Sequence, residues 1–446
     1  MNKIMSKVEE LLMPLAEKVT EQKHLTAMKD GLLLVMPLII VGSVFLVIAN
    51  LPIPGFPELI ASIFGAGWAD KLGYVVGVTF DIMAIITVLG VAYRLAQSYK
   101  VEALAAGAIA LCAFFLVTPF SIAFKPEGAT QAYAVRGIPI ALMGSKGLFV
   151  AIIVGLISTE IYRKVIQKGI VIRMPKGVPS AVSQSFASLI PAAVVLTFFW
   201  IIKLILEMTT FGDVHTLITK IISAPLSGLG NSLIGAIIYT LLVGLLWCFG
   251  IHGGAIMGGI LGPVLLTLND ANRLAYQSGE PVTNIFTSTF VDVFVFAGGA
   301  GATLIFTLLM IFRARSKQLK ALGKLSVGSG LFNINEPILF GTPIVLNPVL
   351  MIPFIFAPVV MVIIAYMSMK IGLVPKPVGI AVPWTMPIFV SGYLATGGKI
   401  SGAILQLVNL LVAMAIWYPF FNMWDKQKVK EELQDEQEQS VVVNDQ

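Results

Sequence analysis

The chain alternates between long apolar runs and short polar segments. Runs of about 20 apolar residues are long enough to cross the hydrocarbon core of a bilayer as helices. The pattern predicts an all-α polytopic membrane protein with about ten transmembrane helices, together with re-entrant hairpins and interfacial amphipathic helices. The expected spans are 31–50, 73–95, 101–119, 145–162, 187–208, 232–250, a short glycine-rich run at 250–268, 285–312, 349–369 and 401–423.

Lysine and arginine residues in the short connecting segments set the expected orientation, because such residues are enriched in cytoplasmic loops. The densest cluster follows the fourth span and consists of Arg163, Lys164, Lys168, Arg173 and Lys176. With this cluster inside and an even number of spans, both termini are expected in the cytoplasm.

The polar segments also indicate how the chain is divided. We expect a cytoplasmic amphipathic arm over 1–30, where apolar and charged residues recur at helical spacing. An N-terminal transmembrane domain should follow over 31–165, an interfacial linker over 166–186 and a C-terminal transmembrane domain over 187–424. The polar cytoplasmic tail over 425–446 is expected to be disordered.

Composition excludes several classes of protein. Of the 446 residues, 57% are hydrophobic and 12% are charged, about half the charged fraction of a soluble domain. The net charge of +6 does not indicate nucleic acid, since the basic residues lie between apolar spans rather than in one patch. Cys112 and Cys248 lie within apolar runs without metal-ligand spacing, which predicts buried, inert thiols and no metal site.

A broken apolar stretch over 328–348, GSGLFNINEPILFGTPIVLNP, contains the first candidate for chemistry. Its one carboxylate, Glu336, lies beside Asn333 and Asn335, and its prolines prevent a continuous helix. A charged side chain at bilayer depth costs ~3 kcal/mol, so it normally faces a cavity or a partner. The stretch predicts a re-entrant hairpin beside a polar chamber. The alternative is a solvated glutamate at the cytoplasmic edge of the membrane.

His252, in the glycine-rich run GIHGGAIMGG, is the second candidate. A histidine both donates and accepts hydrogen bonds, which suits holding a hydroxyl group. The alternative is a histidine bonded to a nearby carbonyl among closely packed helices.

Trp247 and Trp384 lie near broken apolar segments, where flat aromatic rings would stack on the apolar face of a sugar. Tryptophans of the membrane interface are the competing interpretation.

Other polar side chains and glycines are weaker candidates. The run AGGAGA at 297–302, which includes Gly299, lacks the strand–helix context of a dinucleotide site, so close packing or approach to a ligand explains it better. We expect Asp81 and Arg94 to pair and Asp292 to contact a neighbouring helix, all as structural residues. The remaining polar candidates are Gln184, Asn231, Asn284, Asn333, Asn335 and Thr385.

The sequence shows no phosphoryl-carrying machinery of its own. It contains no Walker-type phosphate loop, no Ser/His/Asp nucleophile motif and no cytosolic domain suited to a phosphocysteine or phosphohistidine. We therefore expect no cofactor. If a group is transferred here, its donor must arrive on another protein.

Over nearly its whole length the chain resembles the membrane component, enzyme IIC, of the lactose/cellobiose/diacetylchitobiose family of the bacterial phosphoenolpyruvate-dependent sugar phosphotransferase system. The resemblance rests on MPLAEKV at 13–19, WCFGIHGG at 247–254 and, most specifically, NEPILFG at 335–341. It implies a permease subunit of the bacterial cytoplasmic membrane without a phosphorylated residue. Its N-terminal domain would form the contact of a homodimer, and its C-terminal domain would enclose a disaccharide.

The resemblance also implies roles for individual residues. His252 and Glu336 would contact the sugar near its C6 hydroxyl, and Trp247 and Trp384 would contact its rings. A cytosolic enzyme IIB would donate a cysteine-bound phosphoryl group during import, and membrane lipid is the other expected partner. From the residues alone, two alternatives stay open: a proton-coupled secondary sugar transporter that uses Glu336 and His252 as a proton relay, and a non-transporting scaffold.

Overall fold

A computed structural model of the protein describes residues 22–49, 55–126, 131, 133–175, 177–223, 225, 228, 231–342, 344–345 and 347–444. Residues 1–21 of the expected N-terminal arm lie outside these ranges. Within them, seven helical segments are long and apolar enough to cross a membrane, and α7 (Ala103–Val117) and α14 (Leu233–Cys248) are shorter apolar helices. The predicted all-α membrane class is confirmed, whereas the count of ten spans stays a prediction.

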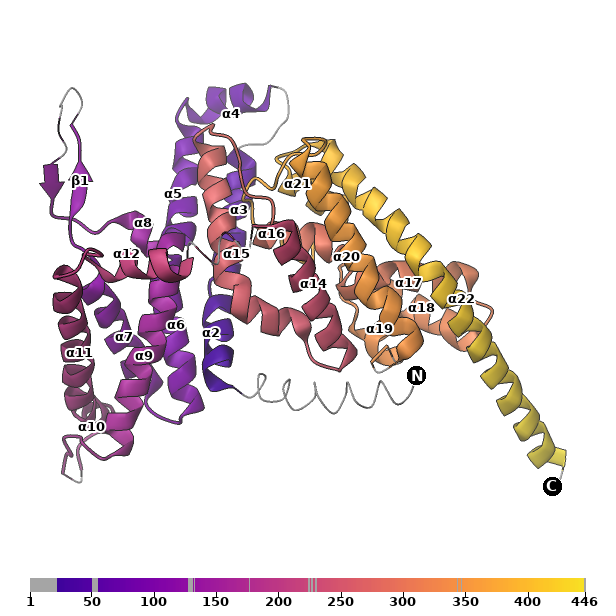
Figure 1. Ribbon diagram of the computed structural model, residues 1–446, viewed down its shortest axis with the longest axis horizontal. Coiled ribbons are helices and arrows are strands. Elements are labelled where there is room, and N and C mark those ends of the chain that lie inside the picture. The colour runs from indigo at the N-terminus through magenta and orange to yellow at the C-terminus, as the bar shows by residue number, and fades with distance from the viewer. Residues whose placement is uncertain are drawn as a thin grey trace.

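Two groups of helices follow each other along the chain and lie side by side (Figure 1). The N-terminal part consists of α2 (Lys23–Leu33), α3 (Met36–Ala49), α4 (Phe56–Phe64), α5 (Trp68–Phe80), α6 (Met83–Ser98), α7 (Ala103–Val117), an exposed hairpin of β1 (Ile122–Phe124) and β2 (Tyr133–Val135), α8 (Ile140–Met143), η1 (Ser145–Gly147), α9 (Leu148–Gln167), α10 (Ser180–Ala187), α11 (Leu189–Glu207), α12 (Val214–Ile218) and η2 (Thr219–Ser223). The C-terminal part consists of α14 (Leu233–Cys248), α15 (Gly253–Gln277), α16 (Ser288–Phe290), η3 (Val291–Val295), η4 (Ala300–Ala302), α17 (Thr303–Arg313), α18 (Lys317–Gly330), α19 (Glu336–Gly341), α20 (Pro348–Lys370), α21 (Val390–Ala395) and α22 (Ile400–Asn444).

The N-terminal core includes α11, which the sequence assigned to the other domain. Phe114 of α7, Val154 of α9 and Phe199 of α11 are buried in one cluster. The Tyr162 and Ser188 hydroxyls, which are 3.0 Å apart, also join α9 to the start of α11. The predicted domain limit at residue 187 is therefore wrong. The N-terminal part extends through η2, because α11 buries one apolar side against α7 and α9.

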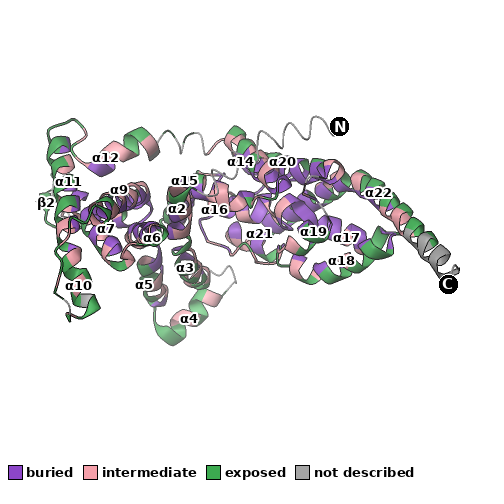
Figure 2. Cartoon of the chain, turned by 90° about the horizontal axis from the view of Figure 1, so that it is seen from below, coloured by how far each residue is buried: buried purple, intermediate pink, exposed green. Residues whose placement is uncertain are grey.

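The C-terminal core is rich in aromatic side chains. Phe286, Phe294, Phe306 and Trp417 are fully buried there, and the Phe306 and Trp417 rings stack with centroids 4.6 Å apart. Buried residues accordingly concentrate around α17 and α21 in Figure 2. The same cluster takes in apolar side chains of α2 and α3, so these two helices border both parts of the molecule.

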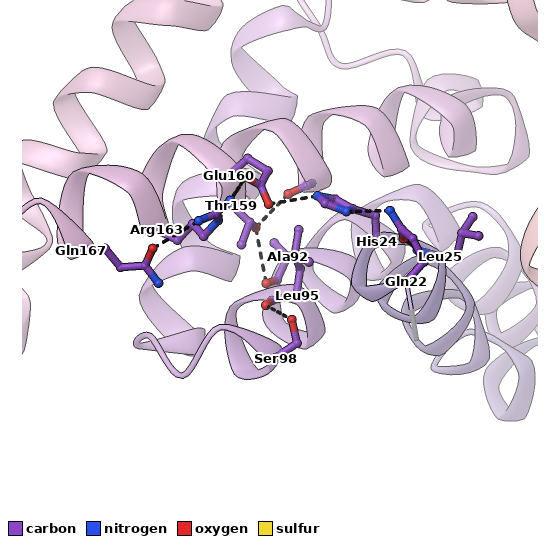
Figure 3. A network of polar contacts seen from close by, with 11 residues as sticks. Gln22, His24, Leu25, Ala92, Leu95, Ser98, Thr159, Glu160, Arg163 and Gln167 are labelled. Atoms are coloured by element: carbon purple, nitrogen blue, oxygen red, sulfur yellow. Dashed lines mark hydrogen bonds and ion pairs between the residues drawn. The ribbon is translucent and has the colours of Figure 1, made fainter. Parts of the chain in front are cut away.

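A polar network holds the start of α2 against α9 (Figure 3). His24 Nε2 lies 2.9 Å from Glu160 Oε1, and the Arg163 guanidinium donates to Glu160 Oε2 at 2.6 Å. The guanidinium also lies over the Tyr99 ring, 4.1 Å from its centroid. One carboxylate thus joins two basic side chains from different helices, which fixes where α2 begins.

Asp81 pairs across the two parts of the molecule rather than with Arg94. Its Oδ1 accepts a hydrogen bond of 2.9 Å from Arg273 of α15, whose side chain is 2% exposed. Arg94 instead donates to Gln97 within α6. The predicted Asp81–Arg94 pair is therefore wrong, because α15 brings a buried guanidinium closer to the end of α5.

The glycine-rich run continues as one helix beyond its predicted end at residue 268. α15 reaches Gln277 and includes part of the segment that was expected to form an external loop. Its polar residues face inward and hold a distant loop: Asn269 Nδ2 donates to the Gly379 carbonyl at 3.1 Å, and Asn272 Nδ2 to the Pro377 carbonyl at 2.7 Å. Buried amides that find backbone partners are compatible with a helix interior.

The predicted long span at 285–312 is broken in its middle. α16 and η3 end before a turn in which Gly298, Gly299 and Gly301 have positive φ angles, and α17 starts only at Thr303. Glycine adopts positive φ without the steric cost that a Cβ brings. The AGGAGA run therefore ends one helix and begins another.

A helical hairpin is present around Glu336, as the sequence predicts. α18 and α19 form its two arms, and residues 331–335 form the turn. Glu336 is the first residue of α19, directly after the turn. The depth of this hairpin in a membrane stays a prediction.

The C-terminal tail is helical over 425–444, so the prediction of disorder is wrong for these residues. They continue α22 to Asn444. Asp425 accepts hydrogen bonds from the Arg315 and Ser316 amides at 3.0 Å, and Glu432 accepts from the Gln318 amide at 2.8 Å. The two carboxylates satisfy amides at the start of α18 that have no partner within their own helix.

Candidate functional site

A cavity of about 460 Å³ lies where the two parts of the molecule meet. α2 contributes one side of it, α14, α15 and η3 contribute further walls, and the α18–α19 hairpin reaches it with Glu336. This volume is within the range of small-molecule sites in proteins. The cavity brings together the predicted site residues Trp247, His252, Gly299, Asn333, Asn335, Glu336 and Trp384.

The turn before Glu336 is held by Asn333, whose φ is +62°. Its Nδ2 donates to the Trp384 carbonyl at 2.6 Å and to the Met386 carbonyl at 3.0 Å. Its Oδ1 accepts from the Gly298 amide at 2.9 Å. Asparagine tolerates this left-handed conformation better than most residues. Asn333 therefore joins three loops and fixes the walls around Glu336.

Gly299 and Asn335 form a second close contact of the hairpin. A Cβ on Gly299 would lie 3.0 Å from both the Asn333 carbonyl oxygen and the Asn335 Cβ, and Gly299 has a φ of +84°. Asn335 Nδ2 donates to the Ala300 carbonyl at 2.9 Å. Only glycine fits at position 299 without displacing the turn that precedes Glu336.

Glu336 has a carboxylate oxygen that the protein leaves unsatisfied. Its Oε2 is buried and has no hydrogen-bond partner among the described residues. A buried carboxylate oxygen without a partner is costly, and such groups require an explanation such as a ligand. Glu336 is therefore placed to accept a hydrogen bond from a hydroxyl group in the cavity.

His252 caps α15 and keeps its second nitrogen available. Its Nδ1 accepts a hydrogen bond of 3.0 Å from the Ala255 amide. In the neutral ring the proton then resides on Nε2, which becomes a donor. The Trp247 and His252 rings are 4.4 Å apart at their centroids, so the tryptophan supports the imidazole from one side.

The two tryptophans differ in what they offer to a ligand. Trp247 is 7% exposed and lies largely behind His252, whereas Trp384 is 49% exposed. Both rings line the cavity. Trp384 therefore presents the larger flat surface, and a sugar ring is the kind of ligand that packs on such a surface.

Gln184 and Asn231 do not belong to the cavity. Gln184 is on α10, in the N-terminal part of the molecule. Asn231 Nδ2 donates to Asn284 Oδ1 at 2.9 Å, and Asn231 Oδ1 accepts from the Ile285 amide at 3.1 Å, so this residue fixes a loop. Their predicted role in ligand binding is not supported by these positions.

Further polar residues of the cavity, among them Ser288 of α16, were not predicted as ligand contacts. Lys29, Tyr239 and Asp292 line it from α2, α14 and η3. Asp292 could have been predicted from the sequence. It is a carboxylate within an apolar span, and the same feature identified Glu336 as a candidate. Lys29 lies near the start of a span, where a lysine is ordinary and gives no signal.

A second hollow of about 450 Å³ lies between α2, α9 and α11. Its lining is mainly aliphatic and aromatic, with His24, Glu160 and Lys164 as its ionisable residues. The Glu160 carboxylate is already bonded to His24 and Arg163, so the cavity at Glu336 is the better candidate site.

Cysteine and metal chemistry receive no support from the described residues. No group of three or more His, Cys, Asp or Glu side chains in them is arranged to hold a metal ion. Cys248 is buried as predicted, but Cys112 is exposed on α7, so the prediction that both thiols are buried is wrong for Cys112.

Comparison with known proteins decides the family. The family model described as "Phosphotransferase system, EIIC" matches residues 29–358. The chain belongs to the phosphotransferase-system EIIC family. It is therefore a sugar permease component of that system and a multi-pass bacterial membrane protein, and the family implies a sugar substrate and an EIIB partner. The alternative of a proton-coupled transporter is not supported.

Individual EIIC relatives are similar over nearly the full chain. The PTS system cellobiose-specific EIIC component of Geobacillus stearothermophilus is 56% identical over 98% of this chain and 97% of that protein. The lichenan permease IIC component of Bacillus subtilis (strain 168) is 53% identical over 97% of this chain and 96% of its own length. The crystal structure of ChbC, the IIC component from the N,N'-diacetylchitobiose-specific phosphotransferase system, matches with a TM-score of 0.93 and 54% identity, covering 95% of this chain and 99% of that one.

Proposed function

We propose that the protein imports a disaccharide of the cellobiose or N,N'-diacetylchitobiose type and presents its C6 hydroxyl to phosphorylated EIIB. The names of the relatives that are more than 50% identical support this substrate class. The cavity supports it independently, since two tryptophan rings and a few convergent polar groups suit a sugar.

The observation that carries the proposal is the unsatisfied Glu336 oxygen. In the proposed step the sugar O6–H donates to this carboxylate while O6 attacks the phosphorus atom. The O6–P bond forms, the P–S bond to the EIIB cysteine breaks, the cysteine leaves as a thiolate and the O6 proton passes to Glu336. Phosphoryl transfer depends mainly on positioning and electrostatics, which a fixed acceptor provides.

His252 supports the same end of the sugar. Its Nε2–H is available once Nδ1 is used by the Ala255 amide. As a donor, it holds a sugar hydroxyl in place while Glu336 accepts from O6. Donor and acceptor together define the orientation of the reacting group.

Release of the product follows from charge. The cavity contains two carboxylates, Glu336 and Asp292. A neutral sugar tolerates them, whereas a sugar phosphate carries up to two negative charges and is repelled once Glu336 has released the O6 proton. Alternating access would then move the C-terminal part, which carries the sugar, past the N-terminal part.

The test is sugar uptake into vesicles that contain the purified protein, with and without phosphorylated EIIB inside. We expect label from cellobiose or N,N'-diacetylchitobiose to accumulate as sugar phosphate only with the phosphorylated partner. Accumulation of free sugar along a proton gradient, without that partner, would contradict the proposal. Running both sugars in competition identifies the preferred one.

We also propose a homodimer formed through the N-terminal part, with both termini in the cytoplasm. The family resemblance and the basic segment after the fourth span support these two points. Light scattering on the detergent-solubilised protein should give twice the mass of one chain after subtraction of detergent. A protease that digests the tail only in inside-out vesicles would support the orientation, and digestion from the outside would contradict it.

A further inference from the structure

Among the described residues that line the cavity, Lys29 is the only lysine or arginine. The other ionisable residues there are His252, Tyr239, Asp292 and Glu336. With the histidine neutral, Lys29 is the one cation of this described lining that a negatively charged group entering the cavity can bind. A lysine ammonium is a compact charge suited to binding phosphate oxygens.

The position of Lys29 is set by close packing between α2 and α15. A Cβ on Gly259 of α15 would lie 3.3 Å from the Lys29 Cβ and 3.7 Å from the Leu25 carbonyl oxygen. The absence of a side chain at Gly259 thus lets the two helices approach closely. Lys29 is then held beside the cavity on the N-terminal part, whereas Glu336 and His252 belong to the C-terminal part.

The ammonium group is only loosely engaged by the protein. Lys29 Nζ lies 3.3 Å from Asp30 Oδ1, and the two side chains are 33% and 32% exposed. Exposed ion pairs of this kind contribute little and exchange readily. Lys29 is therefore free to reorient toward a stronger anionic partner in the cavity.

Building on the proposed function, we propose that Lys29 binds the phosphoryl group as it is transferred to the sugar. The sugar is neutral until that moment, so the ammonium charge does little for sugar binding. It acts when the phosphoryl oxygens enter between Lys29 and the two carboxylates. An interaction made only with the transferring group raises the rate without raising affinity for the substrate. When the C-terminal part moves away from α2, the sugar phosphate loses its contact with the Lys29 ammonium group but remains beside the two carboxylates. The loss of this attraction favours release of the product.

The experiment compares Lys29→Met, Lys29→Arg and the parent protein. Binding of cellobiose and of its 6-phosphate is measured by tryptophan fluorescence without EIIB, and phosphoryl transfer is measured with phosphorylated EIIB. Lys29→Met should lower the transfer rate and the affinity for the sugar phosphate by about 10- to 100-fold. Affinity for free sugar should change by less than about threefold, which also shows that the variant is folded.

Two controls separate charge at this position from charge in general. Lys29→Arg keeps the cation and should recover most of the transfer rate. Lys71→Met removes an exposed lysine from α5, outside the cavity, and should match the parent.

Each other outcome counts against a specific statement. If Lys29→Met transfers at the parental rate, or loses free sugar and sugar phosphate to the same extent, the role of Lys29 is wrong while the proposed function stands. If the parent protein neither binds nor phosphorylates a disaccharide, the proposed function fails and the role of Lys29 fails with it.

Discussion

The carboxylate of Glu336 differs from an amide in its charge and in its ability to take a proton. Glu336→Gln keeps the size and one acceptor oxygen, so binding of free sugar should change by less than about tenfold. Transfer from EIIB should fall by at least about 100-fold, because the acceptor for the O6 proton is lost. Single-turnover transfer and equilibrium binding measure the two effects separately.

A matched control uses a glutamate far from the chemistry. Glu58→Gln changes an exposed residue of α4 and should leave both binding and transfer unaltered. Transfer at the parental rate in Glu336→Gln would mean that another group, or solvent, takes the proton.

Seven residues of the cavity lining could be recognised from local sequence, and the errors and omissions have physical causes. Glu336 was evident because a charge within a broken apolar stretch needs a cavity. Asn231 was misassigned because a polar residue that fixes a loop looks the same in sequence as one that binds a ligand. Lys29 was missed because its role depends on α2 lying against Gly259, a contact between residues far apart in the chain.

The helical tail gives a prediction about how α18 is stabilised. Glu432 accepts hydrogen bonds from the Ser316 hydroxyl at 2.6 Å and from the Lys317 and Gln318 amides at 3.0 and 2.8 Å. Glu432→Gln removes the charge that favours the positive end of a helix, which costs about 1 kcal/mol. Thermal unfolding in detergent should show a lower midpoint for this variant.

Glu431→Gln is the matched control, since Glu431 contacts only Gln427 and Lys428 of its own helix among the described residues. Its effect on the midpoint should be within about 0.5 kcal/mol. Equal effects of the two substitutions would show that the tail does not cap α18.

His215 gives the N-terminal core a predicted dependence on pH. The side chain is 3% exposed, and burial lowers its pKa to about 4, against an opposing effect of the Asp213 charge. An unfolded histidine has a pKa of about 6.5. Between these values the unfolded state binds a proton that the folded state does not, so stability falls as pH decreases from about 6.5 toward 4, by up to about 3 kcal/mol.

The measurement is the unfolding midpoint of the parent and of His215→Gln across this pH range. Glutamine removes the titrating group and retains a polar side chain opposite Thr118, whose Oγ1 lies 3.0 Å from His215 Nε2. The slope should be shallower in the variant. An unchanged slope would place the pH dependence in other groups.

Element boundaries were harder to predict than element types. The span at 285–312 has the composition of one helix, and its break depends on glycines in an apolar run that also occur in intact membrane helices. The end of α15 was set too early because Asn269 and Asn272 look like loop residues until their carbonyl partners at Gly379 and Pro377 are known.

The division of the whole molecule was predicted in the wrong place for a related reason. Basic residues and prolines over 166–186 indicate a segment outside the membrane, but they do not show which core the next span joins. α11 is apolar enough to cross a membrane wherever it packs. Its partners, α7 and α9, are fixed only by tertiary contacts.

Contacts between the two parts predict how their movement is controlled. Arg273 of α15 bonds Asp81 of the N-terminal part at 2.9 Å, and the Ala381 amide donates to Ser43 Oγ of α3 at 2.8 Å. The proposed alternating access requires these bonds to break. Asp81→Asn leaves Arg273 paired with Asp270 inside α15, so α15 stays folded while the link between the parts weakens.

Asp81→Asn should therefore shift the equilibrium away from the arrangement described here by about 1 kcal/mol, or about fivefold, with little change in intrinsic sugar affinity. Distances between spin labels at the exposed positions Tyr74 on α5 and Ile371 at the end of α20 report the shift. Asp70→Asn makes the same chemical change at an exposed site of α5 and should leave the distances unaltered. If Asp81→Asn also leaves them unaltered, the ion pair is incidental, and the Ser43 hydrogen bond and the apolar contacts hold the two parts in this arrangement.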